Sequence, residues 1–387
     1  MGAVADLFAP PLAVASHPVT LATARICAEL LEPHAAAADD PARGVDRAHV
    51  RALADAGLLS VKIPVAEGGH GATGRVDVES VELVAAACGA TWFVVTQHRN
   101  PQGYARGDLR GLPAEACRLG PAADLHRAAL ADAGCLTGIA IAHIRRPGPP
   151  AVRAEPAPGG GWTFTGRADW CTGWGLTDLV MIAAATAADR HVYALVPAVE
   201  RPGLRAGAPI PLAVMGGTRT VGLTLDAMAV APDEVLLDID GPAWRRDDAV
   251  RTADARPASL GLLRRVLVEL ERCGLERDRP EALDAAHTLG ERAAALRAVA
   301  YTLLHDVAAG DRIRERTLLR GELAELTVRS ANALVAARSG SAVLLGSPEQ
   351  RWAREAMFHL VQGQTAAIRA AQLGAAADPC RMSPSAG

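Results

Sequence analysis

Aromatic residues are scarce in this chain of 387 residues, since Phe, Trp and Tyr together make up only 3% of it. Half of the residues are nevertheless apolar, so the chain can bury a sizeable core. Ala, Leu and Val must build most of that core, which excludes an interior organised around large rings. The length is enough for two or three domains.

An excess of charge of either sign is also missing. The 40 basic and 43 acidic residues give a formal net charge of −3 at pH 7. Proteins that bind nucleic acid usually carry a strongly basic face, because the phosphate backbone is negative. The composition offers no electrostatic case for such a partner, and we expect none.

Paired cysteines and long apolar segments are absent as well. The seven cysteines include no C-x-x-C pair and are odd in number, which favours reduced thiols in a cytoplasmic protein. The longest apolar run, Leu179–Ala188, has ten residues, which is too short to span a bilayer. Because the first residues include Asp6 and no basic segment, we expect neither a signal peptide nor a membrane partner.

The chain contains three successive kinds of sequence pattern. Residues 1–130 favour helices, with Asp46 as a candidate N-cap, and predict an N-terminal helical domain. Residues 131–243 alternate β-rich runs with turns, and residues 244–377 return to helical spacing. Residues 378–387 are expected to form a disordered tail.

The middle segment predicts a small β-barrel or sandwich. Glycine and proline separate its β-rich runs at intervals of about 8 to 15 residues, as is typical of such folds. The candidate strands are Cys135–Ile141, Trp162–Cys171, Asp178–Ala184, His191–Val196, Val221–Leu225 and Val235–Leu237.

The last segment carries apolar residues at helical spacing in four places. Four amphipathic helices with short connections predict a four-helix bundle. The charged run Arg312–Arg316 is expected on a solvated helix face. The four apolar stripes are Leu263, Val266, Leu267 and Leu270; Leu289, Ala293, Leu296, Ala300 and Leu303; Leu319, Leu323, Leu326 and Leu334; and Phe358, Val361, Thr365 and Ile368.

One stretch of the middle segment has a composition that is unusual for a plain strand. Gly159–Gly161 predict a tight turn that leads into the strand Trp162–Cys171. Trp170 and Trp174 then lie four residues apart, with Thr172 between them and a glycine on either side of Trp174. Flat rings beside a hydroxyl and bare backbone suit a flat aromatic ligand. Tryptophans that fill a core are the alternative.

Four local patterns resemble the acyl-CoA dehydrogenase superfamily, and the order of helices, β-domain and helical bundle is the same as in that family. The resemblance implies an α+β, acyl-CoA dehydrogenase-like fold. The four patterns are Ala54–Leu58 leading to Ile63–Gly71, Glu79–Ala90, Gly166–Thr172 and Pro348–Ala356. They are similar, in that order, to the family's L-x-x-A-G-L … P-x-x-x-G-G-x-G segment, its next helix, its G-x-K-x-W-I-T-N strand and its P-x-x-R-x-x-R-D turn.

The resemblance also implies a bound FAD between the β-domain and the bundle, in a homodimer or homotetramer. Trp170 would lie against the isoalloxazine ring, and Thr172 would form a hydrogen bond near N5. N5 is the hydride acceptor, so a hydroxyl donor there would stabilise the charge that builds up on reduction. Gly340 and Gly346 stand where the family has a turn that touches the flavin pyrophosphate across a subunit contact.

Two of the family's cofactor-binding markers are altered in this sequence. At the start of the β-domain, Ala142 stands in place of a threonine that contacts the flavin, and His143 in place of an acid. In the bundle, the R-x-x-F-G motif is absent, and its arginine is the one that meets the FAD pyrophosphate. Arg277 or Arg279 can substitute for it, although Arg279 also fits an ordinary helix boundary.

The position of the family's catalytic base is altered too. In the family this base is the glutamate of a Y-E-G-T-x-x-I motif, and Gln362 takes its place here. Acyl-CoA dehydrogenation removes an α-proton with a carboxylate, which a neutral amide cannot do. The residues that follow, Gly363, Gln364 and Thr365, are expected cofactor contacts. Glu355 is a nearby carboxylate, but it fits the structural R-x-x-R-D turn better.

Two histidines are further candidate site residues. His359 lies one helical turn before Gln362 and is either a proton donor near a flavin or a residue packed at the bundle surface. His98 either faces the substrate from the first domain or ends a helix in solvent. Superfamily members that act as monooxygenases with reduced flavin and oxygen often lack the dehydrogenase glutamate and favour histidines in this region.

The sequence therefore predicts an FAD-dependent oxidoreductase that resembles acyl-CoA dehydrogenases and acts on an acyl thioester or a related small molecule. Its electrons would pass to or from an electron-transfer flavoprotein or a flavin reductase, and no metal site is expected. Two alternatives stay open. The protein is a reduced-flavin-dependent monooxygenase, or it is a non-catalytic relative that keeps the fold as a binding or assembly partner.

Overall fold

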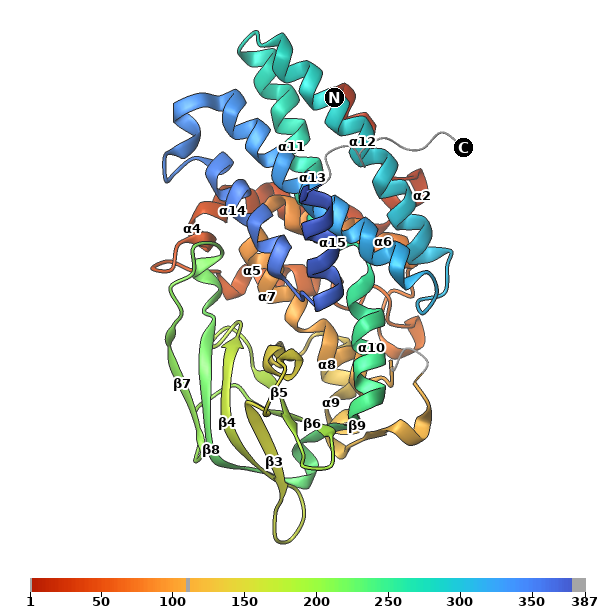
Figure 1. Ribbon diagram of the computed structural model, residues 1–387, viewed down its shortest axis with the longest axis vertical. Helices are drawn as coiled ribbons and strands as arrows, with labels where there is room; N and C mark the ends of the chain where they lie inside the picture. The colour runs from red at the N-terminus through yellow and green to blue at the C-terminus, as the bar shows by residue number, and fades with distance from the viewer. Residues whose placement is uncertain (1, 109–111, 378–387) are drawn as a thin grey trace. The chain divides into compact units, whose positions relative to one another are not determined.

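The computed structural model describes residues 2–108 and 112–377 (Figure 1). Contacts divide the chain into two compact units, which we treat separately. The helical unit comprises the residues up to 36, residues 74–89 and the residues from 249 onward, and the sheet unit comprises Ala37–Thr73 and Ala90–Asp248. These units cut across the predicted segment 1–130. The predicted tail, 378–387, lies outside the described residues.

The described part of the sheet unit contains a nine-stranded sheet with the strand order β1-β9-β6-β5-β3-β4-β8-β7, and β2 pairs with β5. All six predicted strands are present, and β4 has the predicted bounds. Three short strands, β1, β3 and β7, were not predicted. The strands are β1 (Cys117–Leu119), β2 (Thr137–Ala140), β3 (Val152–Pro156), β4 (Trp162–Cys171), β5 (Leu179–Ala185), β6 (Arg190–Pro197), β7 (Leu204–Pro209), β8 (Val221–Val230) and β9 (Val235–Asp240).

The predicted tight turn joins β3 to β4 in an antiparallel hairpin, which is visible as the long loop that β3 leads into in Figure 1. Pro156 pairs with Trp162 across the hairpin. Gly159, Gly160 and Gly161 all have positive φ angles, of 86°, 98° and 76°. Only glycine adopts this conformation readily, so the three glycines define where β4 begins.

The central strands are buried on both faces of the sheet. In β5, Val180 and Ile182 belong to one apolar cluster, while Met181 and Ala183 belong to the cluster on the other face. Successive side chains of a strand point to opposite faces. A strand that is covered on both faces therefore reads as the continuous apolar run found in the sequence.

Helices of the sheet unit pack on the second of these clusters. Tyr104 of α8 (Arg99–Ala105) and Leu130 of α9 (Pro121–Ala131) are buried there. Another helix, α5 (Arg47–Asp55), begins where the sequence predicted, because the Asp46 carboxylate accepts a hydrogen bond from the Ala48 amide at 2.8 Å.

The helical unit is built around three long helices that run side by side in Figure 1: α11 (Pro257–Glu276), α12 (Pro280–His305) and α13 (Ile313–Arg338). The leucines of the predicted stripes in α11 and α13 are buried, which confirms both stripes. Proline opens α11, α12 and α14 (Pro348–Val361), a position where its missing amide hydrogen is no loss. The last helix is α15 (Ala366–Ala377), and α6 (Gly74–Ala87) packs on α11.

The described residues contain further helical segments. They are α1 (Ala3–Asp6), α2 (Leu12–Ala15), α3 (Pro18–Ile26), the π-helical turn Cys27–Leu31, α4 (Glu32–Asp39), α7 (Gly89–Gln97), α10 (Gly241–Ala253) and short 3-10 turns that include η4 (Ala142–Arg145), η5 (Gly216–Thr218) and η7 (Ser339–Val343).

The prediction of a single fourth bundle helix is wrong. The helical spacing from Phe358 to Ile368 suggested one helix, but α14 ends at Val361 and α15 begins at Ala366. Gly363, between them, has a φ of +56°, a left-handed conformation that ends a helix. Val361, which was expected to face the core, is 60% exposed.

The prediction for the charged run Arg312–Arg316 is wrong at its last residue. Arg316 is only 1% exposed, because its guanidinium pairs with Asp254 and donates hydrogen bonds to the carbonyls of Val307 and Ala308 at 3.0 Å. A buried arginine needs such partners, since an unpaired buried charge is very costly. The rest of the run lies on the surface, as predicted.

Candidate functional site

The end of β4 presents an accessible tryptophan ring. Trp170 is 44% exposed, whereas its neighbours Cys171 and Thr172 are buried. Trp174 differs from Trp170, because it is partly buried and packs against the apolar cluster of the sheet. The alternative in which both tryptophans fill a core therefore applies to Trp174 alone.

Thr172 begins a row of three hydrogen-bonded threonines. Its Oγ1 lies 3.1 Å from Oγ1 of Thr220, which lies 2.9 Å from Oγ1 of Thr218. Thr218 in turn donates its hydroxyl hydrogen to the Met215 carbonyl at 2.8 Å. Thr172 directly follows β4 and Thr220 directly precedes β8, next to the paired residues Cys171 and Val221, so the strand ends bring the row together.

Sequence reasoning did not single out Thr218 or Thr220. They lie 46 and 48 positions from Thr172 in the chain, and only the pairing of β4 with β8 brings them close. The alternation of threonines in Thr218-Arg219-Thr220, directly before a predicted strand, is the one local signal that pointed to them.

The backbone beside Thr172 and Trp174 is bare and tightly turned. Gly173 and Gly175 have φ angles of +86° and +78°, so both positions favour glycine. The Gly173 amide donates to the Thr218 carbonyl at 3.0 Å, which continues the β4–β8 ladder beyond the strands. The bare backbone, the hydroxyl and the open ring of Trp170 form one continuous segment that suits a flat ligand.

The two residues predicted at the start of the β-domain lie in η4, and they differ in exposure. Ala142 is exposed, whereas His143 is buried. The His143 Nε2 lies 2.8 Å from the Ala183 carbonyl of β5, and burial lowers the pKa of the ring. His143 is therefore neutral and fastens η4 to the sheet. A role for either residue in holding a cofactor stays a prediction.

His98 is buried in the sheet unit between α7 and α8, so the alternative of a solvated helix end is wrong. Its Nε2 lies 2.8 Å from the Leu130 carbonyl, which also accepts a hydrogen bond from Gln102. Burial lowers the pKa of His98 to about 4. Its Nδ1 has no partner among the described residues. Contact with a substrate stays a prediction.

In the helical unit, the loop between α14 and α15 is held by its own side chains. Gln364 donates hydrogen bonds to the Leu360 carbonyl at 2.9 Å and to the Gln372 side chain at 3.0 Å. The Thr365 hydroxyl accepts a hydrogen bond from the Ile368 amide at 3.3 Å and caps α15. Both side chains thus have structural partners, and their predicted contact with a cofactor is untested.

Two arginine side chains also contact the loop between α14 and α15. Arg320, which is buried, donates hydrogen bonds to the carbonyls of Gln362, at 2.6 Å, and Thr252. A Cβ atom added at Gly363 would lie 3.0 Å from Nη2 of Arg256. A larger residue at Gly363 would therefore be in tight contact with Arg256, and the positive φ of +56° also favours glycine there.

Gln362 differs from the other residues of this loop in the hydrogen bonding of its side chain. Its Oε1 is buried and has no hydrogen-bond partner among the described residues, and a buried acceptor without a partner is costly. His359, one turn earlier, is buried rather than at the bundle surface, and burial together with Arg320 and Arg256 lowers its pKa to about 3. Both residues are therefore neutral near pH 7.

Glu355 has the structural role that its sequence context predicted. It is buried and lies 3.4 Å from the Arg351 guanidinium, four residues earlier on α14. Opposite charges in contact stabilise the ionised carboxylate. Glu355 is thus committed to an ion pair.

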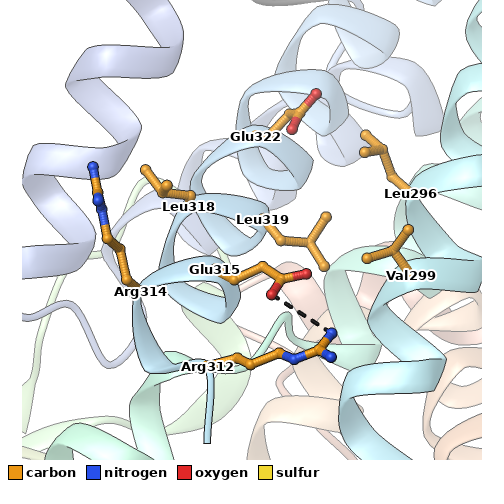
Figure 2. Close-up of a pocket in the computed structure, with 8 residues that line it drawn as sticks. All are labelled: Leu296, Val299, Arg312, Arg314, Glu315, Leu318, Leu319 and Glu322. Atoms are coloured by element: carbon orange, nitrogen blue, oxygen red, sulfur yellow. Dashed lines mark ion pairs between the residues drawn. The ribbon is translucent and has the colours of Figure 1, made fainter. Parts of the chain in front are cut away.

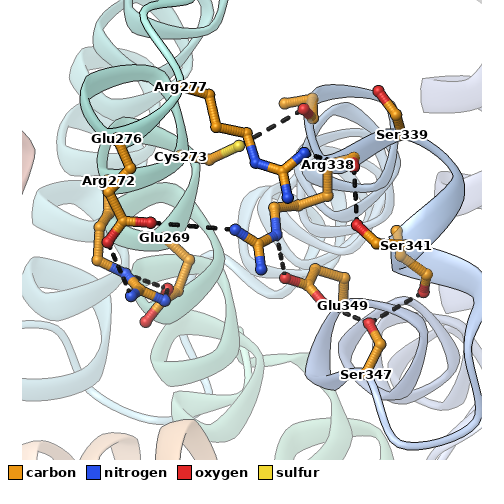
Figure 3. A network of polar contacts seen from close by, with 12 residues as sticks. Glu269, Arg272, Cys273, Glu276, Arg277, Arg338, Ser339, Ser341, Ser347 and Glu349 are labelled. Atoms are coloured by element: carbon orange, nitrogen blue, oxygen red, sulfur yellow. Dashed lines mark hydrogen bonds and ion pairs between the residues drawn. The ribbon is translucent and has the colours of Figure 1, made fainter.

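The two arginines that were considered for binding a pyrophosphate also have hydrogen-bond partners within the protein. Arg277 donates to the Arg338 carbonyl at 3.0 Å, and Arg279 donates to the Ala337 carbonyl and to the Ser339 hydroxyl. Figure 3 shows Arg277 reaching the end of α13, where Arg338 also pairs with Glu349 at 2.7 Å. Cations at a helix C-terminus satisfy its free carbonyls, so both arginines cap α13.

A hollow of about 560 Å³ lies on the helical unit, away from these residues (Figure 2). Leu296 and Val299 of α12 face Leu319 of α13 across it, Leu318 lies on the side of Arg314, and Arg312 pairs with Glu315, 3.8 Å apart. It contains none of the predicted site residues.

Metal binding and membrane insertion find no support in the described residues. Within them, no group of three or more His, Cys, Asp or Glu side chains is placed to hold a metal ion. Neither range, 2–108 or 112–377, contains a helix with the length and apolar character needed to cross a bilayer. The six cysteines in these ranges are free thiols.

Solved structures share this architecture over nearly the whole chain. Butyryl-CoA dehydrogenase from Megasphaera elsdenii is 14% identical, with a TM-score of 0.76 over 96% of this chain and 100% of that one. Glutaryl-CoA dehydrogenase from Mycobacterium smegmatis, solved with FADH2, is 15% identical, with a TM-score of 0.75 over 97% and 98%. The chain has the acyl-CoA dehydrogenase-like fold.

The same fold occurs in a protein of different chemistry. Dibenzothiophene monooxygenase from Paenibacillus sp. A11-2 is 19% identical, with a TM-score of 0.73 over 91% of this chain and 95% of that one. That protein has also been solved with FMN and indole. The acyl-CoA dehydrogenase-like fold therefore supports dehydrogenases and a monooxygenase alike, and it does not by itself choose between them.

One part of the sequence also matches a family model. Residues 19–103 match the acyl-CoA dehydrogenase N-terminal domain. A comparison with curated protein sequences finds no match. The chain is thus similar to the acyl-CoA dehydrogenase N-terminal domain over residues 19–103, and it shares the fold of acyl-CoA dehydrogenases over nearly its whole length.

Proposed function

We propose that this protein is a monooxygenase that uses a reduced flavin and molecular oxygen to oxygenate a small organic molecule. One oxygen atom enters the substrate and the other leaves as water, while the reduced flavin gives up two electrons. The observation that carries the proposal is the chemistry of the loop between α14 and α15, where Gln362 stands at the position that the sequence resemblance assigns to the family's catalytic carboxylate.

Dehydrogenation of an acyl thioester needs a base, and this loop offers a poor set of candidates. The Gln362 amide does not take up a proton near pH 7, and Glu355 is held in an ion pair with Arg351. His359 is a weak base, because burial and two arginines lower its pKa to about 3. General-base catalysis requires a pKa closer to the working pH. Oxygenation by a reduced flavin does not require this proton abstraction.

The residues at the end of β4 fit a flavin ring. Trp170 offers an accessible aromatic face, Thr172 a hydroxyl, and Gly173 a stretch of bare backbone. When bound, the flavin would supply the two electrons, and the protein would supply orientation and electrostatics. The buried Oε1 of Gln362 suits a ligand that donates a hydrogen bond.

FAD is the predicted cofactor, and FMN is an equal candidate under this proposal. Arg277 and Arg279, the two arginines available for a pyrophosphate, both cap α13. FMN has no pyrophosphate and needs no such arginine. A separate flavin reductase would deliver the reduced flavin, and we propose a homodimer or homotetramer as the assembled state.

The second candidate function is oxidation of an acyl thioester by bound FAD, as in the dehydrogenases that share the fold. The match of residues 19–103 to the acyl-CoA dehydrogenase N-terminal domain favours it. Under this alternative the electrons would leave to an electron-transfer flavoprotein. The non-catalytic alternative predicts that no flavin binds.

An anaerobic experiment separates the three functions. Purified protein is mixed with chemically reduced FMN or FAD and, separately, with oxidised FAD followed by butyryl-CoA. The proposal predicts binding of the reduced flavin and no bleaching by butyryl-CoA. Bleaching of the flavin by butyryl-CoA would overturn the proposal in favour of the dehydrogenase, and failure to bind any flavin would favour the non-catalytic relative.

A further inference from the structure

Three threonines at the end of β4 form a chain of hydrogen bonds that ends at a backbone carbonyl. Thr172, Thr220 and Thr218 are all buried, and their hydroxyl oxygens are separated by 3.1 and 2.9 Å. The row ends at the Met215 carbonyl, 2.8 Å from Oγ1 of Thr218. A carbonyl accepts hydrogen bonds and never donates them, so the far end of the row has a defined polarity.

This polarity sets the direction of every bond in the row. A hydroxyl has one hydrogen to donate and two lone pairs that accept. Thr218 gives its hydrogen to Met215, so in its contact with Thr220 it must accept. Thr220 has then given its own hydrogen to Thr218, so it accepts from Thr172. The Thr172 hydroxyl has thereby used its only hydrogen and retains lone pairs alone.

We propose that Thr220 is a positioning residue that makes the Thr172 hydroxyl an acceptor toward the ligand. The end of β4 would then select a ligand edge that carries N–H or O–H. In a flavin, the reduced form presents such an edge, because its N5 bears a hydrogen. The oxidised form does not, because its N5 is a bare acceptor. The inference rests on the proposed function, because it takes Thr172 as the residue beside N5.

The surrounding backbone holds the row in this direction. Met215 adopts a left-handed conformation with a φ of +53°, and its amide donates to the Asp39 carboxylate at 2.6 Å. The Thr220 carbonyl accepts from the Ile210 amide at 2.8 Å. A reversal of the row would leave the Met215 carbonyl with only its hydrogen bond from the Thr218 amide, at 3.2 Å, and the loss of the hydrogen bond from the Thr218 hydroxyl is unfavourable.

The consequence is a difference in affinity between the two redox states. An oxidised flavin would place its N5 lone pair against a Thr172 lone pair, whereas the reduced flavin would donate a hydrogen bond there. One hydrogen bond of this kind changes the affinity ratio by about tenfold. Tighter binding of the reduced form raises the midpoint potential of the bound flavin, by about 30 mV for each tenfold in a two-electron couple.

The variant Thr220→Val removes the acceptor of the Thr172 hydrogen and keeps the shape of the side chain. The freed hydroxyl can then donate to N5 of an oxidised flavin. We expect the ratio of reduced to oxidised affinity to fall about tenfold, mainly through tighter binding of the oxidised form. Thr220→Ser keeps the hydroxyl, so it should retain the wild-type ratio.

Thr137→Val is the matched control. Thr137 is also a buried threonine of the sheet unit, but its hydroxyl has no partner among the described residues. The change therefore removes a hydroxyl of the same kind without touching the row. It should leave the affinity ratio and the potential at their wild-type values.

The dissociation constants of FMN and FAD are measured anaerobically in both redox states for the wild type and each variant, and the potential of the bound flavin is measured by dye equilibration. If Thr220→Val does not fold, Thr218→Val replaces it, because it removes the anchor of the row and should lower the ratio in the same way. Wild-type protein that binds neither flavin in either state would overturn the proposed function and the inference together. Binding of reduced flavin with an unchanged ratio in Thr220→Val would overturn the inference alone.

Discussion

The end of β4 in the sheet unit and the loop after α14 in the helical unit both carry predicted site residues, and they differ in how their polar groups are satisfied. At the end of β4, the tryptophan, the threonine and the glycines that suit a flavin ring are all present, and the buried hydroxyls satisfy one another. In the loop after α14, Gln362 presents a buried acceptor without a partner among the described residues. Under the proposed function, the end of β4 would hold the flavin, and the loop after α14 would not abstract a proton.

Removal of Arg320 should have the largest effect, because it breaks the scaffold of the loop after α14. Arg320→Ala leaves the carbonyls of Gln362 and Thr252 without their buried donor, and we expect a loss of about 3 kcal/mol in the free energy of unfolding. Chemical denaturation measures it. Arg314→Ala, an exposed arginine on the same helix, should change stability by less than about 0.5 kcal/mol. Equal effects of the two variants would show that the loop is not anchored as described.

The pH dependence of stability is the next largest effect, and it distinguishes a neutral His359 from a charged one. Burial lowers the pKa of His359 to about 3 from an ordinary value of 6.5. Between these values the unfolded chain binds a proton that the folded chain does not, so stability falls as the pH is lowered below 6.5. The contribution is up to about 1.4 kcal/mol for each pH unit.

His359→Gln should remove this part of the pH dependence. Denaturation midpoints measured between about pH 5 and 7 would then fall less steeply than in the wild type. His98, with a pKa lowered to about 4 by burial, provides the comparison in the sheet unit, and His98→Gln should flatten the profile in the same way. A profile unchanged by His359→Gln would mean that the ring binds a proton as readily in the folded protein as in the unfolded chain, which would reopen its role as an acid.

Trp170→Ala tests whether the end of β4 contacts the flavin. Because Trp170 is 44% exposed, its removal should change the free energy of unfolding by less than about 0.5 kcal/mol. Loss of an aromatic face against the flavin ring should weaken flavin binding by about tenfold. Trp174→Ala is the contrasting variant, since Trp174 packs against the apolar cluster of the sheet and should cost stability. If flavin affinity is unchanged in Trp170→Ala, the Trp170 ring does not contact the flavin.

The regular parts of the fold were predictable because they rest on local patterns. Three consecutive glycines and a period of two located β4, and leucines at helical spacing located α11 and α13. The break between α14 and α15 was not predicted, because the apolar spacing continues through it while a single glycine at a left-handed φ ends the helix. Periodicity averages over a window, and one residue can override it.

The candidate site was predictable only where a residue type alone carries the chemistry. Trp170, Thr172 and Gln362 could be singled out from the sequence. Thr220 could not, since its importance comes from the direction of hydrogen bonds between strands 48 positions apart. The burial of Arg316 was missed for the same reason, because its partner Asp254 lies 62 positions away.

The smallest predicted effect concerns the unpartnered amide itself. Gln362→Leu removes a buried acceptor that has no partner among the described residues, so the flavin-free protein should gain about 1 kcal/mol in stability. Gln364→Leu is the matched control two residues later, and it should lose about 1–2 kcal/mol because Gln364 donates to Leu360 and Gln372.

Flavin binding completes this test. If the side-chain oxygen Oε1 of Gln362 receives a hydrogen bond from the ligand, then Gln362→Leu should weaken flavin binding while it stabilises the free protein. These opposite signs, measured by denaturation and by flavin titration, are expected of a group kept for binding at a cost in stability. Destabilisation of the free protein by both leucine variants would instead mean that Gln362 is a structural residue like Gln364. The contrast between the end of β4 and the loop after α14 would then be lost.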